Sequence, residues 1–536
     1  MTGLVTGPAA VRRTMPDEDR DRDRFARLVW AEWTKLRSVP AWSIALVAAA
    51  VAMVGFSVLS AAGERRSCSG PTACPAVVVG PGGEAVADSY ELVGRPLTGN
   101  GTLTVQVASL TGLLPPAHRS FGQPIPPAVP LSAGHPGLQP WAKAGLIITS
   151  STRQGAPYAA VMVAADHGVR FQYDYTHDTA SPVDAAAGDS PQWLRLNRTG
   201  NSITAYASPD GITWTRIAAA EMSELPGTVQ AGLFVTSPRD SQITEHPFFA
   251  SGADGPSFAT ATFTHLTATG TSPSDDWTGQ TIGGPDGDYP ALIGSYSRIS
   301  DGSYRVSGSG DIAPQVSGVE GSGITIDRTL DGGFVGLIAF IALGALSTTT
   351  EYRRGLIRTT LTATPRRGRV LAAKAVVIGG VTFALAVPAA AISVLVGQHV
   401  LRANHSLLYP VTAFTEARVI VGTAGFLAVA AVTALALGVI LRRSTGAITA
   451  VVVGIVLPYM IFPGLPAGGA EWLLRVTPTA ALSVQQTLPV YEQVANSYAP
   501  TNGYYPLAPW AGFTVLCAYA ALALAVAVVL LRRRDA

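Results

Sequence analysis

Charged residues are distributed very unevenly along this chain. Six long stretches contain no Asp, Glu, Lys or Arg: Ala41–Ala62, Gly332–Thr350, Ala375–Gln398, Val419–Leu441, Gly446–Ala470 and Ala511–Leu531. An apolar helix of about 20 residues crosses the roughly 30 Å hydrocarbon core of a bilayer. One such stretch fits a buried helix of a soluble protein, but six together indicate an integral membrane protein. We expect a six-helix transmembrane domain from them.

The long region between the first two stretches, Gly63–Asp331, has a different pattern. It is rich in Gly, Pro, Ser and Thr, and apolar and polar residues alternate in short runs. Its clearest part predicts three strands separated by turn sequences: Trp193–Arg198, Ser202–Ser208 and Thr213–Ile217. The runs "AKAGLIITSS", "YAAVMVAA", "GVRFQYDY" and "AGLFVTS" predict four more. Many short strands without a long helix predict an all-β sandwich or barrel.

The segment before the first uncharged stretch predicts an amphipathic helix. Its apolar residues recur at helical spacing: Phe25, Leu28, Val29, Trp33 and Leu36. The other faces carry Arg24, Arg27, Glu32 and Lys35. Tryptophans beside basic residues are typical of a helix in the membrane interface, and Pro40 ends this helix. An ordinary helix next to the membrane, without a mechanical role, is the alternative.

Composition limits the chemistry that this chain performs by itself. Hydrophobic residues make up 48% of it and charged residues 13%. Only three of its 37 Lys and Arg residues are lysines, which we interpret as codon usage of a GC-rich genome. A phosphate-binding P-loop requires Gly-Lys-Ser/Thr, but Lys35 follows a threonine, and Lys143 and Lys374 follow alanines. The sequence therefore contains no P-loop for ATP.

Basic residues flank the uncharged stretches on alternate sides. The first stretch is preceded by Arg27, Lys35 and Arg37, and residues 351–374 lie between the second and the third. Arg442 and Arg443 lie between the fourth and the fifth, and Arg532–Arg534 follow the sixth. Because Lys and Arg are in excess in cytoplasmic loops, we expect a multi-pass plasma-membrane protein with both termini cytoplasmic. The first span, with 40 residues before it, is expected to be retained and not cleaved as a signal peptide.

The basic stretch "EYRRGLIRTTLTATPRRGRVLAAK", Glu351–Lys374, carries seven cations and one acid. Leu356, Ile357 and Leu361 fall near one helical face, and Pro365 ends this predicted helix. A basic cytoplasmic helix can bind anionic lipid headgroups or an acidic groove on a partner protein. Anchoring by positive charge alone is the alternative.

Four segments resemble permease subunits of type-2 ABC exporters: "AEWTKLRSVPAW", the stretch Glu351–Lys374, "WLLRVTPTAALSVQQTLP" and "VVLLRRRDA". The resemblance covers Phe25–Ala62 and Gly332–Ala536. It implies an elbow helix before span 1, a coupling helix that docks on a separate ATPase, and permeases paired as homo- or heterodimers. ATP then binds a partner subunit, and this chain holds no cofactor. The implied ATPase-coupling residues are Glu351, Arg353, Arg354, Gly355, Arg358, Pro365, Arg366 and Arg367.

The predicted strands, in their order along Ser89–Thr269, resemble the concanavalin A-like lectin/glucanase (jelly-roll) sandwich. Candidates for stacking on a sugar are Trp141, Trp193, Tyr206 and Trp214; packing inside the sandwich core is the alternative. Residues 270–331 are either further strands of the same unit or a stalk. Ordinary members of the permease family have a short loop at this place, so the inserted domain leaves the exported substrate open.

The β-rich region carries no recognisable catalytic pattern. A retaining glycosidase needs two carboxylates about 5 Å apart. The acids of the region do not form the E-x-D-x-x-E cluster of glucanases: Asp166, Asp174, Asp178, Glu221 and Glu224. We therefore predict no catalytic residues. Its histidines show no metal-ligand spacing, and we predict no metal site.

Two of the three cysteines lie close together in "CSGPTAC", after the first span. Cys68 and Cys74 are candidates for a disulfide if this region is outside the cell, and two free thiols are the alternative. Cys517 lies in the last uncharged stretch, where it is expected to act as a small hydrophobic residue.

These observations divide the chain into four parts. They are residues 1–40, a cytoplasmic tail with the elbow helix; 41–62, span 1; 63–331, an inserted extracytoplasmic β-sandwich; and 332–536, spans 2–6 with the coupling loop 351–374. The predicted function is that of an exporter permease, not an enzyme. Its predicted partners are a separate ATPase, a second permease, membrane lipid and cell-surface glycan, with no nucleic acid. The alternatives are a membrane-anchored glycan-binding or sensing protein and, third, a surface glycosidase.

Overall fold

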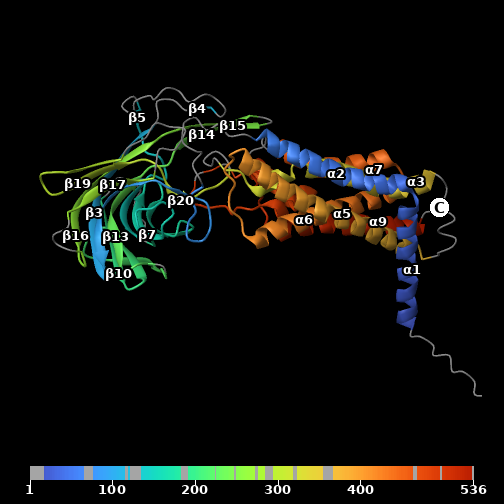
Figure 1. The fold of residues 1–536 in the computed structure, drawn as a ribbon, viewed down its shortest axis with the longest axis horizontal. Helices are drawn as coiled ribbons and strands as arrows, with labels where there is room; N and C mark the ends of the chain where they lie inside the picture. The colour runs from blue at the N-terminus through green and yellow to red at the C-terminus, as the bar shows by residue number, and fades with distance from the viewer. Residues whose placement is uncertain are drawn as a thin grey trace, which may run out of the picture.

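The computed structural model of this protein has a β-rich part at one end and a helical bundle at the other (Figure 1). It describes residues 17–64, 77–114, 119–120, 134–182, 191–223, 225–246, 249–271, 276–283, 294–317, 323–353, 366–462, 467–494, 496 and 498–533. In the chain, the strands come between helices α2 and α3.

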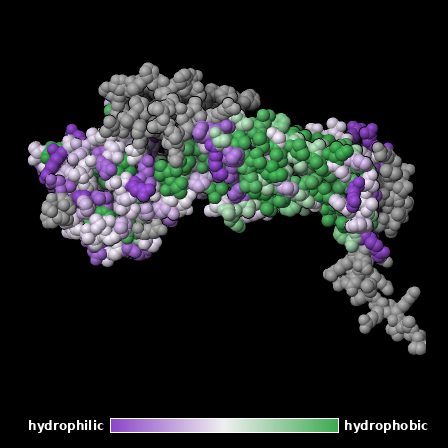
Figure 2. All heavy atoms as spheres, in the orientation of Figure 1, coloured by the Kyte–Doolittle hydropathy of each residue, from purple (hydrophilic) through white to green (hydrophobic). Residues whose placement is uncertain are grey.

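The described α-helices are α1 (Asp17–Ser38), α2 (Pro40–Gly63), α3 (Gly333–Arg353), α5 (Arg367–Ala403), α6 (Ala413–Leu441), α7 (Ser444–Ile461), α8 (Ala467–Val476) and α9 (Pro509–Arg533). Short 3-10 helices are η2 (Ile326–Leu330), η4 (Pro478–Gln485) and η5 (Pro500–Asn502). Among the described residues, six of these helices are long and apolar enough to cross a membrane: α2, α3, α5, α6, α7 and α9. Each predicted stretch overlaps one of them. Figure 2 shows the apolar surface along the bundle, which is compatible with a multi-pass membrane protein.

Helix α1 lies across the end of the bundle, transverse to its long axis (Figure 1). Pro40 is the first residue of α2, so the chain turns there from one helix into the next. Trp30 is 70% exposed and Trp33 is 37% exposed. Exposed indole rings on a helix in this position are suited to the interface between water and lipid.

Two large antiparallel sheets form most of the β-rich part. The first has the order β12 (Thr215–Glu221), β11 (Ser202–Ser208), β10 (Gln192–Thr199), β3 (Gly101–Leu114), β16 (Phe258–Ala268), β19 (Tyr304–Gly308) and β18 (Ser295–Arg298), and β5 (His135–Pro136) pairs with β3. The second has the order β17 (Thr278–Ile282), β2 (Tyr90–Thr98), β13 (Thr228–Thr236), β6 (Lys143–Thr149), β7 (Tyr158–Ala164), β8 (Gly168–Tyr173) and β9 (His177–Ala180).

The two large sheets share one apolar core. Leu194 and Leu196 of β10 are buried in it together with Leu146 and Ile148 of β6. Residues between the buried positions of β10 remain half-exposed, as alternation along a strand with one buried face requires. The predicted all-β region is confirmed as a large pair of antiparallel sheets, and the three strands predicted from Trp193 onward are β10, β11 and β12.

The described residues between 276 and 314 add strands to the same unit and form no stalk. β17 joins the second sheet, and β18 and β19 extend the first. β20 (Ile312–Pro314) pairs with β1 (Val86–Asp88), and β14 (Asp240–His246), β15 (Phe249–Gly255) and β4 (Arg119–Ser120) form a small third sheet. In the chain, β20 is followed by η2 and the helices of the bundle.

The β-rich part is fastened to the bundle around Tyr409. The hydroxyl of this buried side chain donates to the carbonyl oxygen of Val316 at 3.0 Å and accepts the N–H of Gly323 at 3.2 Å. Its backbone N–H donates to the carbonyl oxygen of Ile324 at 3.0 Å. Close by, the Tyr504 hydroxyl accepts the backbone N–H of residue 317 at 3.1 Å. Residues 316, 317, 323 and 324, between β20 and η2, are thereby held against the bundle.

Candidate functional site

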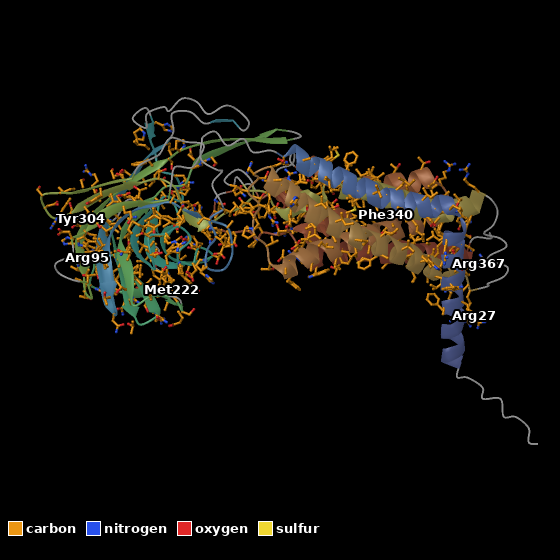
Figure 3. The ribbon with its side chains drawn as sticks, viewed as in Figure 1. Arg27, Arg95, Met222, Tyr304, Phe340 and Arg367 are labelled. Carbon is orange, nitrogen blue, oxygen red and sulfur yellow. The ribbon has the colours of Figure 1, made fainter. Side chains whose placement is uncertain are left out.

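The end of the bundle away from the β sheets is rich in arginine. Figure 3 shows Arg27 and Arg367 at this end. The guanidinium of Arg367 donates to the carbonyl oxygen of Leu531 at 2.5 Å, and that of Arg442 lies 5.3 Å from the centre of the Tyr352 ring. We call this the arginine-rich end. Its arginines at the ends of α3, α5, α6, α7 and α9 are Arg353, Arg366, Arg367, Arg442, Arg443, Arg532 and Arg533.

Four side chains at the arginine-rich end form a compact group of ion pairs. Lys374 Nζ lies 2.9 Å from the Glu32 carboxylate and 2.8 Å from that of Glu351. Lys35 Nζ lies 2.7 Å from Glu32 and 3.7 Å from Glu351. We call these residues the α1–α3–α5 ion cluster. Its two acids balance its two bases, and it joins three helices from distant parts of the sequence.

Burial makes the ion cluster sensitive to the loss of any partner. The side chains of Lys374 and Glu32 are only 9% and 8% exposed. Burial by itself raises the pKa of Glu32, but the ammonium groups of Lys374 and Lys35 lower it, and the resulting pKa lies below its usual value. Glu32 is therefore held as a carboxylate. Removing one ammonium group would leave a buried negative charge without compensation.

The structure places four of the eight predicted coupling residues. Glu351 and Arg353 lie in the last turn of α3, Arg366 directly precedes α5, and Arg367 is its first residue. Arg354, Gly355, Arg358 and Pro365 lie outside the described residues. Helices α3 and α5 thus extend into the predicted loop 351–374 from both ends, and Glu351 contributes directly to the ion cluster.

The sequence prediction did not include Glu32, Lys35 and Lys374 among the site residues. It placed Glu32 on a polar face of α1, but Glu32 is buried between the half-buried Leu28 and Leu36. Leu28, Glu32 and Leu36 are spaced four residues apart and therefore lie on one side of the helix. An acid inside the apolar stripe was the available signal, because a buried carboxylate requires a cation from another element.

Three of the four candidate sugar-binding residues gather on the outer face of the first sheet. Arg195 of β10 lies opposite Tyr206 of β11, and its guanidinium is 3.7 Å from the centre of the Trp214 ring. Trp193, two residues before Arg195, stacks on His265 with 5.2 Å between ring centres. Trp193, Tyr206 and Trp214 are half-buried and lie outside the core between the sheets. We call Trp193, Tyr206 and Trp214 the aromatic strip.

Trp141 is separate from the aromatic strip. It precedes β6 and is 6% exposed. Its ring stacks on His167 with 3.6 Å between ring centres, and the guanidinium of Arg170 lies 5.3 Å from it. Arg170 also binds both carboxylate oxygens of Asp178. Trp141 is thus enclosed by protein side chains.

The outer face of the second sheet is covered by the chain itself. Val86 of β1 and Ile312 of β20 pack there in an apolar cluster with Tyr158. Nearby, the buried carboxylate of Asp88 accepts the Tyr175 hydroxyl at 2.8 Å. Burial raises the pKa of Asp88 to about 6. The segments that connect the β-rich part to the bundle therefore close this face.

The cysteine prediction is tested only for Cys517, because Cys68 and Cys74 lie outside the described residues. Cys517 is a half-buried free thiol in α9. Within the described part of the chain, no group of three or more His, Cys, Asp or Glu side chains is arranged to hold a metal ion.

Comparison with known proteins adds little to this geometry. No family model and no curated protein matches the chain. Solved structures that resemble part of it include a functionally unknown protein from Saccharomyces cerevisiae, with 12% identity and a TM-score of 0.18 over 37% of this chain and 82% of that one. Scytalido-glutamic peptidase with a peptide-based transition-state analogue has 11% identity and a TM-score of 0.22 over 42% of this chain and 98% of that one. Sheep galectin-11 with glycerol has 13% identity and a TM-score of 0.16 over 27% of this chain and 90% of that one. Such low TM-scores support no argument about fold or function.

Proposed function

We propose that this chain is the membrane-spanning permease subunit of an ATP-driven ABC exporter. It works with a separate ATPase that binds the ATP, pairs with a second permease in a homo- or heterodimer, and carries a lectin-like, concanavalin A-like sandwich between spans 1 and 2. The α1–α3–α5 ion cluster is the observation that supports this proposal most directly.

The position of the ion cluster is suited to transmitting movement from a partner at the arginine-rich end. The segment between α3 and α5 leaves α3 after Arg353 and enters α5 at Arg367. Lys374 and Glu351 join these two helices, and Glu32 adds α1. A partner that displaces the segment would therefore displace three helices together, including the transverse helix at the membrane interface.

The distribution of arginine supports an orientation of the bundle. The arginine-rich end lies opposite the β-rich part (Figure 3). Because basic residues are retained on the cytoplasmic side, we place this end and both termini in the cytoplasm of a plasma-membrane protein. The β-rich part is then extracytoplasmic.

The test is co-purification with a P-loop ATPase from native membranes. Changing Arg354 and Arg358 together to Glu is expected to remove most of the bound ATPase, because loss of a buried interfacial charge pair typically costs about 2–5 kcal/mol. The basic residues from Arg366 to Lys374 would still keep the segment on the cytoplasmic side. The readout is the ratio of ATPase to permease after affinity purification.

The control changes Arg532 and Arg533 to Glu at the end of α9, outside the proposed coupling stretch. This variant is expected to insert normally and to retain the ATPase. If both double variants insert and retain the ATPase equally well, the stretch 351–374 is a positive-charge anchor and the coupling proposal fails.

A second candidate function, a membrane-anchored glycan-binding or sensing protein, is favoured by the aromatic strip. Trp193, Tyr206 and Trp214 lie together with Arg195 on an outer sheet face, and aromatic rings beside polar groups are suited to sugars. Sugar binding by the full chain, without any associated ATPase, would support this candidate over the first.

A further inference from the structure

An open groove lies on the side of the bundle between helices α5 and α9, with α6 as its floor. These three helices lie side by side (Figure 1). The groove offers a volume of about 280 Å³, and each helix that lines it is long and apolar enough to cross a membrane. We call it the α5–α6–α9 groove. Its lining includes Gly379 of α5, Val429 and Val432 of α6, and Cys517, Ala521 and Leu524 of α9.

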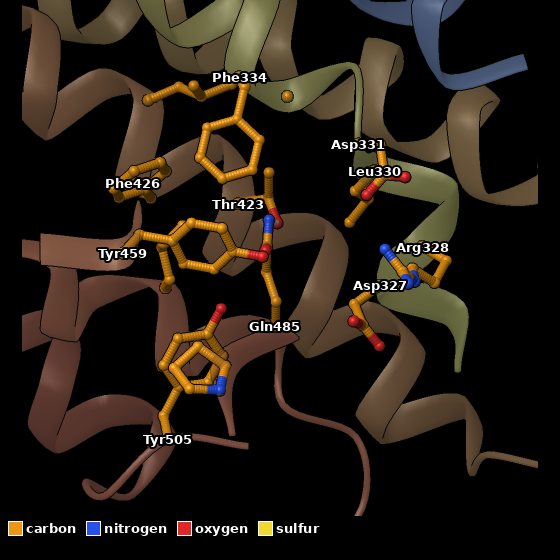
Figure 4. Close-up of a pocket in the computed structure, with 14 residues that line it drawn as sticks. Asp327, Arg328, Leu330, Asp331, Phe334, Thr423, Phe426, Tyr459, Gln485 and Tyr505 are labelled. Atoms are coloured by element: carbon orange, nitrogen blue, oxygen red, sulfur yellow. Dashed lines mark hydrogen bonds between the residues drawn. The ribbon is translucent and has the colours of Figure 1, made fainter. Parts of the chain in front are cut away.

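The size and lining of this groove suit a hydrocarbon chain. Apart from the weakly polar Cys517 thiol, all of its lining side chains are aliphatic or absent. The hollow beside η2 differs in both respects (Figure 4). Its volume is about 30 Å³, which is room for about two water molecules, and polar groups such as Asp327 and Gln485 line it. The α5–α6–α9 groove is therefore the one that accepts an apolar ligand.

Guanidinium groups from both walls of the groove converge at the arginine-rich end. Arg367, at the start of α5, donates to the carbonyl oxygen of Leu531 in α9 at 2.5 Å. In the opposite direction, a guanidinium nitrogen of Arg532 lies 3.9 Å from the place that a Cβ atom on Gly368 would occupy. Arg532 and Arg533 are exposed and form no ion pair with a described residue. The end of the groove is thus positively charged.

The depth of the groove matches the acyl region of one leaflet. At 1.5 Å per residue, Gly379 lies about 18 Å from Arg367 along α5, and Leu524 lies about 12 Å from Arg532 along α9. A bilayer about 40–45 Å thick extends about 20 Å from its headgroups to its midplane. An acyl chain whose headgroup lies beside the arginines therefore reaches the groove.

Charge complementarity favours an anionic phospholipid over a second copy of this chain. The planar donors of arginine match the oxygens of a phosphate group. A guanidinium carries five N–H donors, so Arg367 can bind Leu531 and a phosphate together. A second copy in the same orientation would bring its own arginine-rich end against this one, and like charges repel.

We propose that the α5–α6–α9 groove holds one acyl chain of an anionic phospholipid, with the phosphate between Arg367 and Arg532. The aliphatic side chains of the groove cover the acyl chain, and the two guanidinium groups donate to the phosphate oxygens. The lipid fills the space between α5 and α9. This inference goes beyond the proposed exporter function and does not depend on an ATPase.

The experiment measures lipid binding to the purified and delipidated full chain in detergent by native mass spectrometry. The probes are palmitoyl-oleoyl phosphatidylglycerol, palmitoyl-oleoyl phosphatidylcholine with the same chains, and dihexanoyl phosphatidylglycerol with the same headgroup. The first lipid is expected to bind at least about tenfold more tightly than either of the others, because it alone combines negative charge with a long chain. Equal binding of the two long-chain lipids, or of the two phosphatidylglycerols, would overturn the proposal.

A variant that fills the groove locates the acyl chain. Ala521 lines the groove and is exposed, so a larger side chain enters the groove without displacing a packed one. Ala521→Phe is expected to weaken binding of the long-chain phosphatidylglycerol at least about tenfold. The matched control is Ala518→Phe, at an exposed alanine of α9 outside the lining, and it is expected to bind like the unchanged protein. Equal binding by the two variants would exclude the groove.

A second pair of variants locates the headgroup. Arg532→Gln is expected to weaken the long-chain phosphatidylglycerol at least about threefold and to leave phosphatidylcholine unaffected, since it removes one charge near the phosphate. The control is Arg443→Gln, at an exposed arginine of the same end that precedes α7, and its binding is expected to be unchanged. Equal losses in Arg532→Gln and Arg443→Gln would show general attraction of anionic lipid to this end and would overturn the assigned site.

The same spectra report the number of chains in each particle. A dimer of the unchanged protein that Ala521→Phe separates, with no change in lipid binding, would assign the groove to a second copy and overturn the proposal.

Discussion

All three lysines form ion pairs. Lys143 is fully buried, with Nζ 2.6 Å from Asp311 and 2.8 Å from the carbonyl oxygen of Ile312. Lys374 and Lys35 belong to the α1–α3–α5 ion cluster. Codon usage accounts for how rare lysine is but not for these positions. A compact ammonium group directs three donors into space, whereas the donors of arginine lie in one plane, so lysine can bridge carboxylates from two different helices.

At the residue scale, we predict that Lys374→Met strongly destabilises the protein. The substitution leaves Glu32 and Glu351 facing Lys35 alone, and removal of one partner from a buried ion pair costs about 3–5 kcal/mol. The measurement is the free energy of unfolding of the purified chain by denaturant titration in detergent micelles.

The comparison for Lys374 is Arg475→Met in α8. Arg475 pairs with Glu471 one helical turn away, at 3.0 Å, with both side chains more than half exposed. Exposed pairs of this spacing contribute only about 0.3–0.5 kcal/mol. A loss at Lys374 no larger than the loss at Arg475 would contradict the structural importance of the ion cluster.

At the scale of the elements, turns predicted from sequence have a clear local cause. In the Pro-Asp-Gly turn between β11 and β12, the Asp210 carboxylate accepts the backbone N–H groups of Ile212 and Thr213, each at 2.8 Å. These hydrogen bonds lower the pKa of Asp210 to about 2. Such contacts lie within a few residues, so a short sequence window is enough to predict them.

The sequence did not predict the short helix η4, because polar residues usually indicate exposure to solvent, whereas those of η4 are buried. Thr479 donates to the carbonyl oxygen of Ile455 at 2.6 Å, and Ser483 donates to that of Pro509 at 3.1 Å. Gln485 donates to the Thr423 hydroxyl at 3.1 Å. Partners on neighbouring helices satisfy these groups, and no local pattern reveals those partners.

Close helix packing gives a prediction at the same scale. A Cβ atom on Gly344 of α3 would overlap the carbonyl oxygen of Ala431 in α6, whereas one on Gly380 of α5 would meet no heavy atom within 4 Å. Gly344→Ala is expected to lower the free energy of unfolding by about 1–3 kcal/mol through overpacking.

Gly380→Ala is the matched control for this packing prediction. It is expected to leave stability unchanged or to raise it by up to about 1 kcal/mol, since alanine favours helices over glycine. Both variants are compared with the unchanged protein by denaturant titration. Equal effects of the two substitutions would mean that the α3–α6 contact does not require glycine.

At the scale of the whole molecule, the β-rich part and the bundle form a continuous contact. Gln493, on the segment after η4, donates to the backbone carbonyl oxygen of Tyr175 at 3.3 Å. Ala313 and Val316 pack with Val494 and Tyr504 in a small apolar cluster. These contacts therefore join the sheets to the segments that connect the helices of the bundle.

This arrangement predicts which positions lie on the same side of the membrane. Ser150, after β6, and His405, after α5, are expected outside, because they lie at the end of the molecule that carries the β sheets. Arg367 and the C-terminus are expected inside with the arginine-rich end. Fusions of alkaline phosphatase and of green fluorescent protein at each position provide the measurement. An outside signal at Arg367 would contradict the six-span topology.

The sequence by itself determined the long apolar helices of this protein and the β-rich character of the region between the first two, but not the short helix η4. Uncharged runs and residue alternation predicted six apolar helices and a β-rich region between the first two, because burial of apolar side chains sets the period within each element. Tertiary structure alone decided which side chains meet. Glu32 reaches Lys374, Lys143 reaches Asp311, and Trp141 is separated from the aromatic strip. Such contacts depend on how the chain closes large loops and packs distant elements, so the periodic pattern within one element does not predict them.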